Sequence, residues 1–467
     1  MNRAILLLLL LAGCAVGPDF KPPQMPVPDG WAGSTQTNAP VGLSTWWQTF
    51  NDPQLTALIV DALATNLDVQ LAEARLRESR AARGVVAGGL WPSINGIASY
   101  SRNHESANVS SSVGTKSGDQ NLYLEGFDAV WEVDIFGGIR RNVESANATV
   151  QAAQEGLRDA QVSLAAEVAL DYIQLRGFQQ QIAVAQENLK AQQHTADITR
   201  QKQKAGFVST LDVDNADAQV ATTQSQIPVL EVSAQQAIYA LSMLLARPPA
   251  YLLKELSETQ PLPVTPPQVP VGLPSDLARR RPDIRQAEAQ LHAATAQIGV
   301  AEADLFPKFS LTGNVSWQSD LLHNWFTSPS RASSFGPSMD WALFQGGSIV
   351  SNIREQEALG DEAFITYQKT VLAALQDVEN ALIAYNKEWE HRSALNDAVV
   401  ASRKAVEVSM QLYSAGQTDF LNVLQAQGTL YASENAFVQS NSSAGQDLIA
   451  LYKALGGGWE NGTGQTR

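Results

Sequence analysis

Hydrophobic and polar positions alternate with a period of two in four stretches of the chain. The first pair begins at Ser93 and Tyr123, and the second pair lies at 308–318 and 334–343. Each stretch has one apolar face rich in aromatic side chains and one face of polar, partly charged residues. This alternation over about 10 residues predicts strands of the length that a tilted membrane-spanning strand needs. We therefore expect β-hairpins at about 91–136 and 306–345, with a soluble sandwich as the alternative.

The strand length and the loops between the strands favour a membrane barrel over a sandwich. The segment 104–120 is rich in Ser and Gly, and the segment 320–333 contains several Ser residues, which suits extracellular loops. Four strands are too few to close a barrel, since the smallest single-chain bacterial barrels use eight. An open sheet edge in lipid would leave backbone groups without hydrogen bonds. If these strands span a membrane, copies of the chain must share one barrel.

The pattern changes to helical spacing after each hairpin. A double glycine, 137–138 or 346–347, is followed by roughly 65 residues without proline. At 1.5 Å per residue this predicts about 100 Å of helix. The apolar residues in these runs are small and recur at heptad-like spacing, which lets helices lie close together. A helix of this length exceeds what a globular domain needs and could cross a periplasm.

A tight turn ends each long helix and reverses the chain. The predicted turns lie at about 205–212 and 415–422, with Gly206 and Gly416 as the helix stops. Ser209 with Asp212 forms a capping-box pattern for the next helix, and Thr418 or Asp419 can cap its counterpart;. We expect a kink at Pro228 in the first returning helix, because proline interrupts helical hydrogen bonding.

The two turns divide the chain into repeated halves. Gly416 follows Gly206 by 210 residues, which indicates an internal duplication. We expect a first repeat at 46–247, a proline-rich linker at 248–274 and a second repeat at 275–455. The first repeat opens with a helix that Asp52 caps and Pro53 starts, running to about Arg83. Residues 456–467 are expected to form a flexible C-terminus.

The N-terminus carries an export signal. Arg3 precedes a leucine-rich core, and small residues lead to Cys14, the only cysteine of the chain. Leu-Ala-Gly-Cys matches the bacterial lipoprotein box, so we expect a signal peptide at 1–13, acylation of Cys14 and an extended tether at 14–45. Ala15 is not the Asp that retains lipoproteins in the inner membrane, so the outer membrane is the expected destination. We expect no internal stretch of about 18 apolar residues that could span a membrane as a helix.

Composition excludes several functional classes. The chain has 467 residues, 44% of them apolar, and a net charge of −15. This acidity argues against nucleic-acid binding and suits either a cation-favouring pore or an ordinary acidic protein. The five histidines are scattered without metal-ligand spacing, and we find no nucleophile motif or phosphate loop;. We therefore expect no enzyme activity, no cofactor and no metal.

Specific sequence stretches resemble a known family. The chain is similar to the outer-membrane factors, the TolC-type outer-membrane efflux proteins, and among them to the lipoprotein branch associated with RND multidrug efflux systems. The resemblance runs from about Cys14 to Leu455. It rests on 46–47 with 52–53, Trp131-Glu-Val-Asp-Ile-Phe-Gly-Gly, Arg279-Arg-Arg-Pro-Asp-Ile-Arg-Gln-Ala-Glu, 305–307, Leu343-Phe-Gln-Gly-Gly and 412–426.

This resemblance implies an architecture and partners. The fold would be mainly α with a membrane β part, in which four strands per chain complete a trimeric 12-stranded outer-membrane barrel and the helices form a periplasmic tunnel. The homotrimer would dock a periplasmic membrane-fusion adaptor and an inner-membrane RND-type pump. The acyl chains on Cys14 would anchor the chain in the lipid of the outer membrane.

The resemblance also implies a gate at the periplasmic tip. Asp212 and Tyr413 match one of the family's linking pairs, so a hydrogen bond between them is expected. The family's acidic constriction falls on Asn422 and Gln425, neither of which is acidic here. Asp419 or Asp217 could supply the charge instead. Thr418 stands where the family has a second, basic linking residue.

Three functions follow from the sequence as hypotheses. The first is the outer-membrane channel of a tripartite efflux system, a passive export duct for drugs or other small molecules. The second is the exit duct of a type I protein-secretion system. The third is a periplasmic coiled-coil scaffold lipoprotein without a pore.

Overall fold

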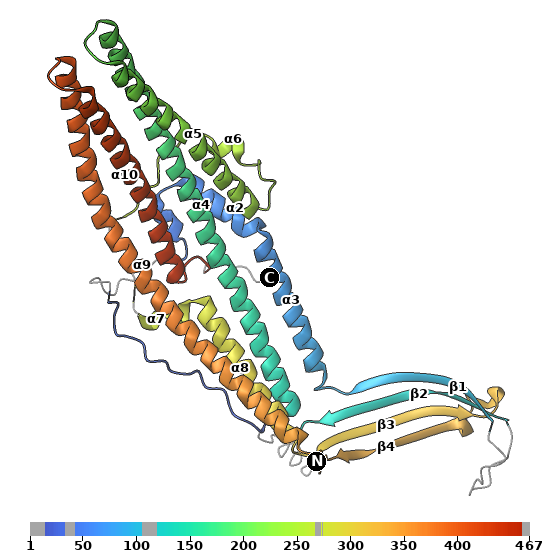
Figure 1. Ribbon diagram of the computed structural model, residues 1–467. Coiled ribbons are helices and arrows are strands. Elements are labelled where there is room, and N and C mark those ends of the chain that lie inside the picture. Colours follow the sequence, from blue (N-terminus) through green and yellow to red (C-terminus); the bar gives the residue numbers. More distant parts are fainter. Residues whose placement is uncertain (1–14, 33–42, 105–118, 267–271, 273, 460–467) are drawn as a thin grey trace. The chain divides into compact units, whose positions relative to one another are not determined.

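A computed structural model describes residues 15–32, 43–104, 119–266, 272 and 274–459. The chain divides into two compact units, each assembled from three separate segments. Unit 1 comprises 1–23, 76–153 and 287–367, and unit 2 comprises 24–75, 154–286 and 368–467. Cys14, the signal peptide and the predicted loop residues 105–118 lie outside the described residues. Figure 1 shows the elements of each unit.

Unit 1 contains one four-stranded antiparallel sheet with the strands in chain order (Figure 1). The strands are β1 (Ser93–His104), β2 (Asp119–Val133), β3 (Lys308–Ser319) and β4 (Arg331–Asp340). They confirm both predicted hairpins. The second hairpin loop holds two short 3-10 helices, η2 (Leu322–Asn324) and η3 (Ser328–Ser330). In the described chain β1 and β4 pair on one side only, so the sheet has two open edges.

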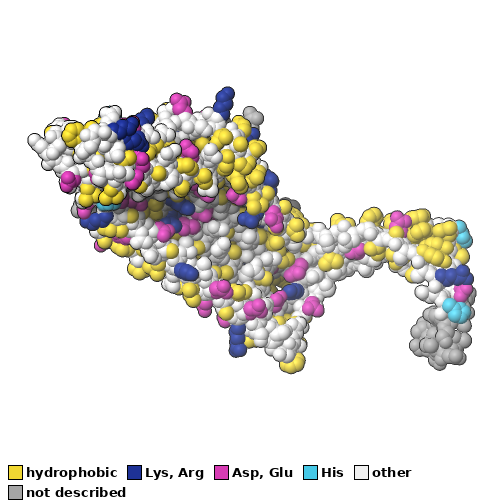
Figure 2. Space-filling model, turned by 45° about the horizontal axis from the view of Figure 1, so that its top comes forward, with side chains coloured by type: hydrophobic (Ala, Val, Ile, Leu, Met, Phe, Trp, Pro, Cys, Tyr) yellow, Lys and Arg dark blue, Asp and Glu magenta, His cyan; other side chains and the backbone are white. Residues whose placement is uncertain are grey.

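The register places the largest apolar side chains of the strands on one face. Phe127 lies opposite Gly96 on one side and Val315 on the other, and Gly313 lies opposite Phe335. Phe127 and Phe335 expose 58% and 77% of their surface in the single chain. The sheet accordingly presents hydrophobic side chains to its surroundings (Figure 2). Large exposed apolar surfaces mark contacts with another protein or a membrane.

The opposite face of the sheet carries a row of polar residues. Asn95 donates a hydrogen bond to Asp128 across β1 and β2, and Ser334 donates to Asn314 across β3 and β4. These four residues form one row across the sheet, because Asn95 pairs with Asp128, Asp128 with Asn314, and Asn314 with Ser334. One face therefore suits lipid and the other suits water, which is the alternation of a membrane barrel.

Two tryptophans fasten the hairpins to the chain that enters them. The Trp131 indole donates to the Leu90 carbonyl just before β1, and the Trp341 indole donates to the Leu305 carbonyl just before β3. Both distances are 3.1 Å. The two halves of the chain thus repeat the same contact at equivalent places.

The long helices also repeat. Helix α4 (Gly138–Lys204) and helix α9 (Ser348–Ser414) each have 67 residues, and α5 (Thr210–Leu244) and α10 (Phe420–Ala454) each have 35. Within unit 2, α4 and α5 form one antiparallel hairpin and α9 and α10 form the other (Figure 1). Pro228 lies inside α5, and the kink expected there stays a prediction.

The first predicted helix is split in two. Helix α2 (Pro53–Thr65) begins as expected, with Asp52 accepting from the backbone N–H groups of Gln54 and Leu55. Asn66 then interrupts it and caps α3 (Leu67–Gly88) by accepting from the backbone of Val69. The stretch 53–88 contains a window long and apolar enough to cross a membrane, so our expectation that no internal stretch would qualify was wrong. One such helical stretch is weak evidence for a span, and four α2 residues in it are buried.

The remaining elements connect these helices. They are η1 (Trp46–Phe50), α6 (Leu253–Leu256), α7 (Pro274–Arg280) and α8 (Pro282–Ala303). The predicted linker is therefore not wholly irregular, because it contains α6. Residues 456–459 were expected to be flexible, but Gly457 and Gly458 are buried against Trp46, and Trp459 packs beneath the Arg158 guanidinium.

Candidate functional site

The two hairpin turns in unit 2 have the same backbone geometry. Gly206 and Gly416 adopt φ angles of +83° and +72°, which L residues with a side chain rarely adopt. The Phe207 N–H donates to the Lys202 carbonyl, and the Gln417 N–H donates to the Leu412 carbonyl. Both predicted glycine stops are thus confirmed.

The helices that follow the turns begin differently. Ser209 accepts from the Asp212 backbone while the Asp212 carboxylate accepts from the Ser209 backbone and hydroxyl, which confirms the capping box. Asp419 occupies the corresponding position before α10, but its side chain makes no capping bond. Thr418 instead accepts from the Asn422 amide. The expected side-chain cap at 418–419 was therefore wrong.

An apolar cluster joins the two hairpins near their turns. It contains Ala196 of α4, Ala216 of α5, Tyr413 of α9, and Phe420 and Val423 of α10, all buried. The Tyr413 and Phe420 rings lie 5.7 Å apart. Because all four helices contribute, separating the hairpins would expose this cluster to water. We call it the tip cluster.

Polar contacts around Tyr413 hold α4 against α9. The Tyr413 hydroxyl donates to the Thr199 hydroxyl at 3.2 Å. The Lys202 ammonium lies 4.1 Å from the centre of the Tyr413 ring and donates to the Tyr413 and Ser414 carbonyls. Burial is the main cause that raises the pKa of Tyr413, and the Asp212 carboxylate adds to it. The phenol therefore stays neutral.

The expected hydrogen bond between Asp212 and Tyr413 is replaced. In the described chain the Tyr413 hydroxyl bonds to Thr199, and the Asp212 carboxylate bonds to Ser209. The capping box explains this change, because it holds the carboxylate at the start of α5. Sequence reasoning missed Thr199 and Lys202. The basic residue in the last turn of α4 was the available signal for Lys202.

Charge near the turns is distributed unevenly. Asp217 forms an ion pair with Arg200, which also pairs with Asp197 at 2.6 Å. Asp419 is exposed, and its carboxylate has no ion pair or hydrogen bond within the described chain. Asn422 and Gln425 are also exposed and lie one turn apart on α10. Of the two carboxylates expected to supply charge, Asp419 is the unpaired one.

In unit 1 the segment after Cys14 is fastened to the helices. We call residues 15–20 the N-terminal strap. The Val16 N–H donates to the Phe136 carbonyl, and Arg141 donates to the Val16 and Gly17 carbonyls and to the Asp19 carboxylate. Because Arg141 lies at the start of α4, its hydrogen bonds attach the strap to this helix.

Close packing and an aromatic contact complete the strap. A Cβ added to Gly17 would lie 2.3 Å from the Gly299 Cα, so the two backbones touch. The Phe20 ring stacks on His292 with centroids 4.3 Å apart, and His292 bonds to Glu144 at 2.9 Å. The part of the predicted tether at 15–20 is therefore packed against α4 and α8 within unit 1.

Comparison with known proteins agrees with this architecture. The model of the family "Outer membrane efflux protein" matches residues 58–247 and 273–457. The chain belongs to this family. It is 32% identical over 457 residues to nodulation protein T of Rhizobium leguminosarum bv. viciae, covering 98% of this chain and 93% of the relative. It is also 32% identical to the toluene efflux pump outer membrane protein TtgC of Pseudomonas putida, covering 98% and 95%.

A solved structure extends the similarity to the fold. The outer-membrane channel OprN matches with a TM-score of 0.90 and 36% identity, covering 96% of this chain and 100% of that one. This outer membrane efflux protein is thus an outer-membrane efflux channel that extends into the periplasm, and it is not an enzyme. The efflux function and the mainly helical fold expected from the sequence are confirmed.

Proposed function

We propose that three copies of this efflux channel complete one 12-stranded barrel. The observation that carries the proposal is the sheet with two open edges, one face of large exposed apolar side chains and one face with a polar row. In a barrel, β4 of one copy pairs with β1 of the next, so every backbone group in the lipid finds a partner. The polar row that contains Asp128 and Asn314 then lines the water-filled interior.

Acylated Cys14 anchors each copy to the outer membrane in this proposal. Ala15, the next residue, packs against Gly137. A Cβ added to Gly137 would lie 2.6 Å from the Ala15 Cβ. Gly137 immediately precedes α4 and follows β2. Ala15, the residue after the attachment point, therefore lies near the residues where the sheet ends and the helices begin. Several acyl chains on one residue would make the anchor essentially permanent.

The tips of the helical hairpins form the periplasmic gate in this proposal. The tip cluster and the Lys202–Tyr413 contact keep the two hairpins of one chain together. Opening would separate them and expose apolar surface, which favours the closed state. Exposed Asp419, Asn422 and Gln425 lie near the turn of α9 and α10, where passing molecules would meet them.

The partners would be a periplasmic membrane-fusion adaptor and an inner-membrane RND-type pump that supplies the energy. We propose that the cargo is drugs, solvents or other small molecules. The name of the toluene efflux relative supports this class of cargo. The channel itself would act as a passive duct.

Deletion of the chain from its host tests the proposal. We expect greater sensitivity to dyes, detergents, antibiotics or solvents, restored by the wild-type chain. A Cys14→Ser chain carrying an ordinary signal peptide would separate anchoring from conduction. Unchanged sensitivity together with an unchanged profile of exported metabolites would refute the proposed export.

A further inference from the structure

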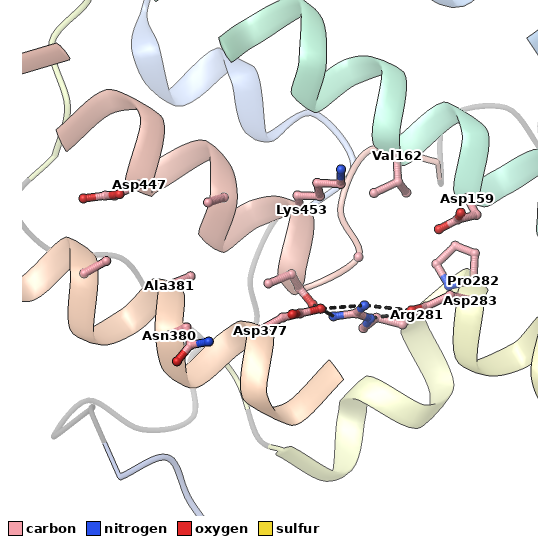
Figure 3. A pocket seen from close by; sticks show the side chains of 14 residues that line it. Asp159, Val162, Arg281, Pro282, Asp283, Asp377, Asn380, Ala381, Asp447 and Lys453 are labelled. Carbon is pink, nitrogen blue, oxygen red and sulfur yellow. Dashed lines mark hydrogen bonds and ion pairs between the residues drawn. The ribbon is translucent and has the colours of Figure 1, made fainter. Parts of the chain in front are cut away.

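A cavity of about 480 Å³ lies among the helices of unit 2 (Figure 3). Helices α4, α9 and α10 and the start of α8 line it. Part of its wall consists of small side chains, namely the buried Ala381 and Ala454 and the exposed Ala384 and Ala450, so the cavity opens to solvent on one side. This size falls within the range of small-molecule sites in proteins, about 300–1,000 Å³. Larger side chains at the alanine positions would fill the space.

At one end of the cavity, carboxylates face cationic side chains. Arg281 pairs with Asp283 at 2.7 Å and with Asp377 at 3.2 Å, and it donates to the Ala454 carbonyl at 3.1 Å. Asp159 lies at the same end (Figure 3). Burial and the nearby Asp283 raise the pKa of Asp159, and the positive charges of Arg281 and Lys453 offset part of this rise. The cationic side chains of the cavity are therefore gathered at this end.

The other end carries an uncompensated carboxylate. Asp447 projects from α10 on the side away from Asp159 and Arg281 (Figure 3). Within the described chain it has no hydrogen bond or ion pair, and its charged neighbour is Glu388 of α9. Burial, with Glu388 adding to it, raises the pKa of Asp447 to about 6. A cation placed beside Asp447 would relieve both effects.

We propose that this cavity binds a small organic amine. Its ammonium group pairs with the Asp447 carboxylate, and its apolar body lies along the alanines of α9 and α10. A free metal ion fits less well, since no group of three potential metal ligands occurs among the described residues. An anion would meet the surplus carboxylates. This inference concerns binding to the purified channel and does not depend on the proposed trimer, gate or cargo.

Calorimetry on the full-length channel in detergent tests the proposal with a matched pair of probes. Phenylbutylamine carries the ammonium, and phenylbutanol replaces it with a neutral hydroxyl. We expect the amine to bind wild type about tenfold more tightly than the alcohol, the size of effect that one partly buried charge pair gives. In Asp447→Asn the two probes should bind equally. Equal binding of both probes to wild type would overturn the proposal.

A second variant tests the location independently of charge. Ala450→Leu fills the cavity and should weaken both probes at least about tenfold. Asp397→Asn removes an exposed carboxylate elsewhere on α9 and should change neither affinity. Circular dichroism of each variant checks that it folds. Unaltered amine binding by both Asp447→Asn and Ala450→Leu would place the ligand elsewhere and refute the site, whereas conductance of the same preparations reports on the channel separately.

Discussion

The Tyr413 hydroxyl donates a hydrogen bond to the Thr199 hydroxyl at 3.2 Å, and both side chains are buried. This contact joins the last turn of α9 to α4 inside the tip cluster. The Thr199 hydroxyl also donates to the Thr195 carbonyl of its own helix. This bond fixes the orientation of the hydroxyl that accepts from Tyr413. The contact is therefore a preorganised link between the two hairpins of one chain.

Removing this link should loosen the tip. Tyr413→Phe keeps the ring in the tip cluster and deletes one hydrogen bond, at a cost of about 1 kcal/mol. We expect a lower thermal unfolding midpoint and a higher resting conductance in planar bilayers. Tyr239→Phe on α5 is the matched control, because its hydroxyl has no hydrogen bond among the described residues. Equal resting conductance of the Tyr413→Phe channel and wild type would contradict a gating role for this link.

Lys202 should matter more than its neighbour Lys204. Lys202→Met removes a cation–π contact and two bonds to carbonyls at the end of α9, and we expect a loss of about 1–2 kcal/mol and increased leakage;. Lys204 is exposed and lacks such contacts in the described chain, so Lys204→Met controls for charge. Antibiotic uptake by cells carrying each variant measures the leak. The same uptake in both variants would mean that net charge, not the Tyr413 contact, controls the tip.

The N-terminal strap should detach when Arg141 is removed. Arg141 has a side chain that is 6% exposed and binds Asp19, Glu144 and two strap carbonyls. In Arg141→Ala the Phe20 ring should leave His292, and chymotrypsin should then cut after Phe20. In wild type the contacts of the strap with Arg141 and His292 hold the half-buried Phe20 in place, and a protease cuts mainly the transiently detached form.

Arg83→Ala provides a control for this experiment. Arg83 also reaches α4, through Asn147, but does not touch the strap. N-terminal sequencing after brief proteolysis gives the cleavage site. Wild-type resistance of the Arg141→Ala protein would show that Arg141 does not hold the strap.

Asp171 should make stability depend on pH. Burial, with Glu167 adding to it, raises the pKa of Asp171 from 3.8 to about 6. The pKa of Asp171 is higher in the folded chain than in the unfolded chain. At pH values below 3.8 the protonated carboxyl therefore contributes its full stabilisation, and this contribution is lost as the pH rises through about 6. Asp171→Asn should therefore be more stable than wild type at about pH 7.5, by on the order of 1 kcal/mol after solvent screening, but not at about pH 4.

Thermal unfolding midpoints at the two pH values measure this effect. Asp397→Asn, a substitution at an exposed position of α9, should leave the unfolding midpoint unchanged at both pH values. A stability gain of Asp171→Asn that is the same at both pH values would show that the carboxyl charge is not its cause.

The sequence predicted the parts of the fold that depend on periodicity and backbone restriction. The alternation around Phe127 and Val315 located the strands, and Gly206 and Gly416 located the turns, because positive φ angles favour glycine. It did not predict the break at Asn66, since an Asn inside an apolar helical pattern becomes a cap only through contacts with residues far along the chain. Asn66 donates to the Leu244 carbonyl, 178 positions away.

The candidate site was predictable only in part for the same reason. The sequence identified Tyr413 and Asp212 but paired them with each other. The actual partners depend on which residue of α4 faces α9, and this is settled by the packing of the tip cluster. Phe20 on His292 is a contact over a still longer separation in the chain, and no local pattern marks it.

The number of chains in one channel particle tests the central claim most directly. Native mass spectrometry of the detergent-extracted channel, with cysteines placed in β1 and β4 for cross-linking between copies, measures it. The account predicts three chains per particle and β4-to-β1 cross-links that close a ring. A single chain per particle, with the apolar face of the sheet covered by its own residues, would contradict it.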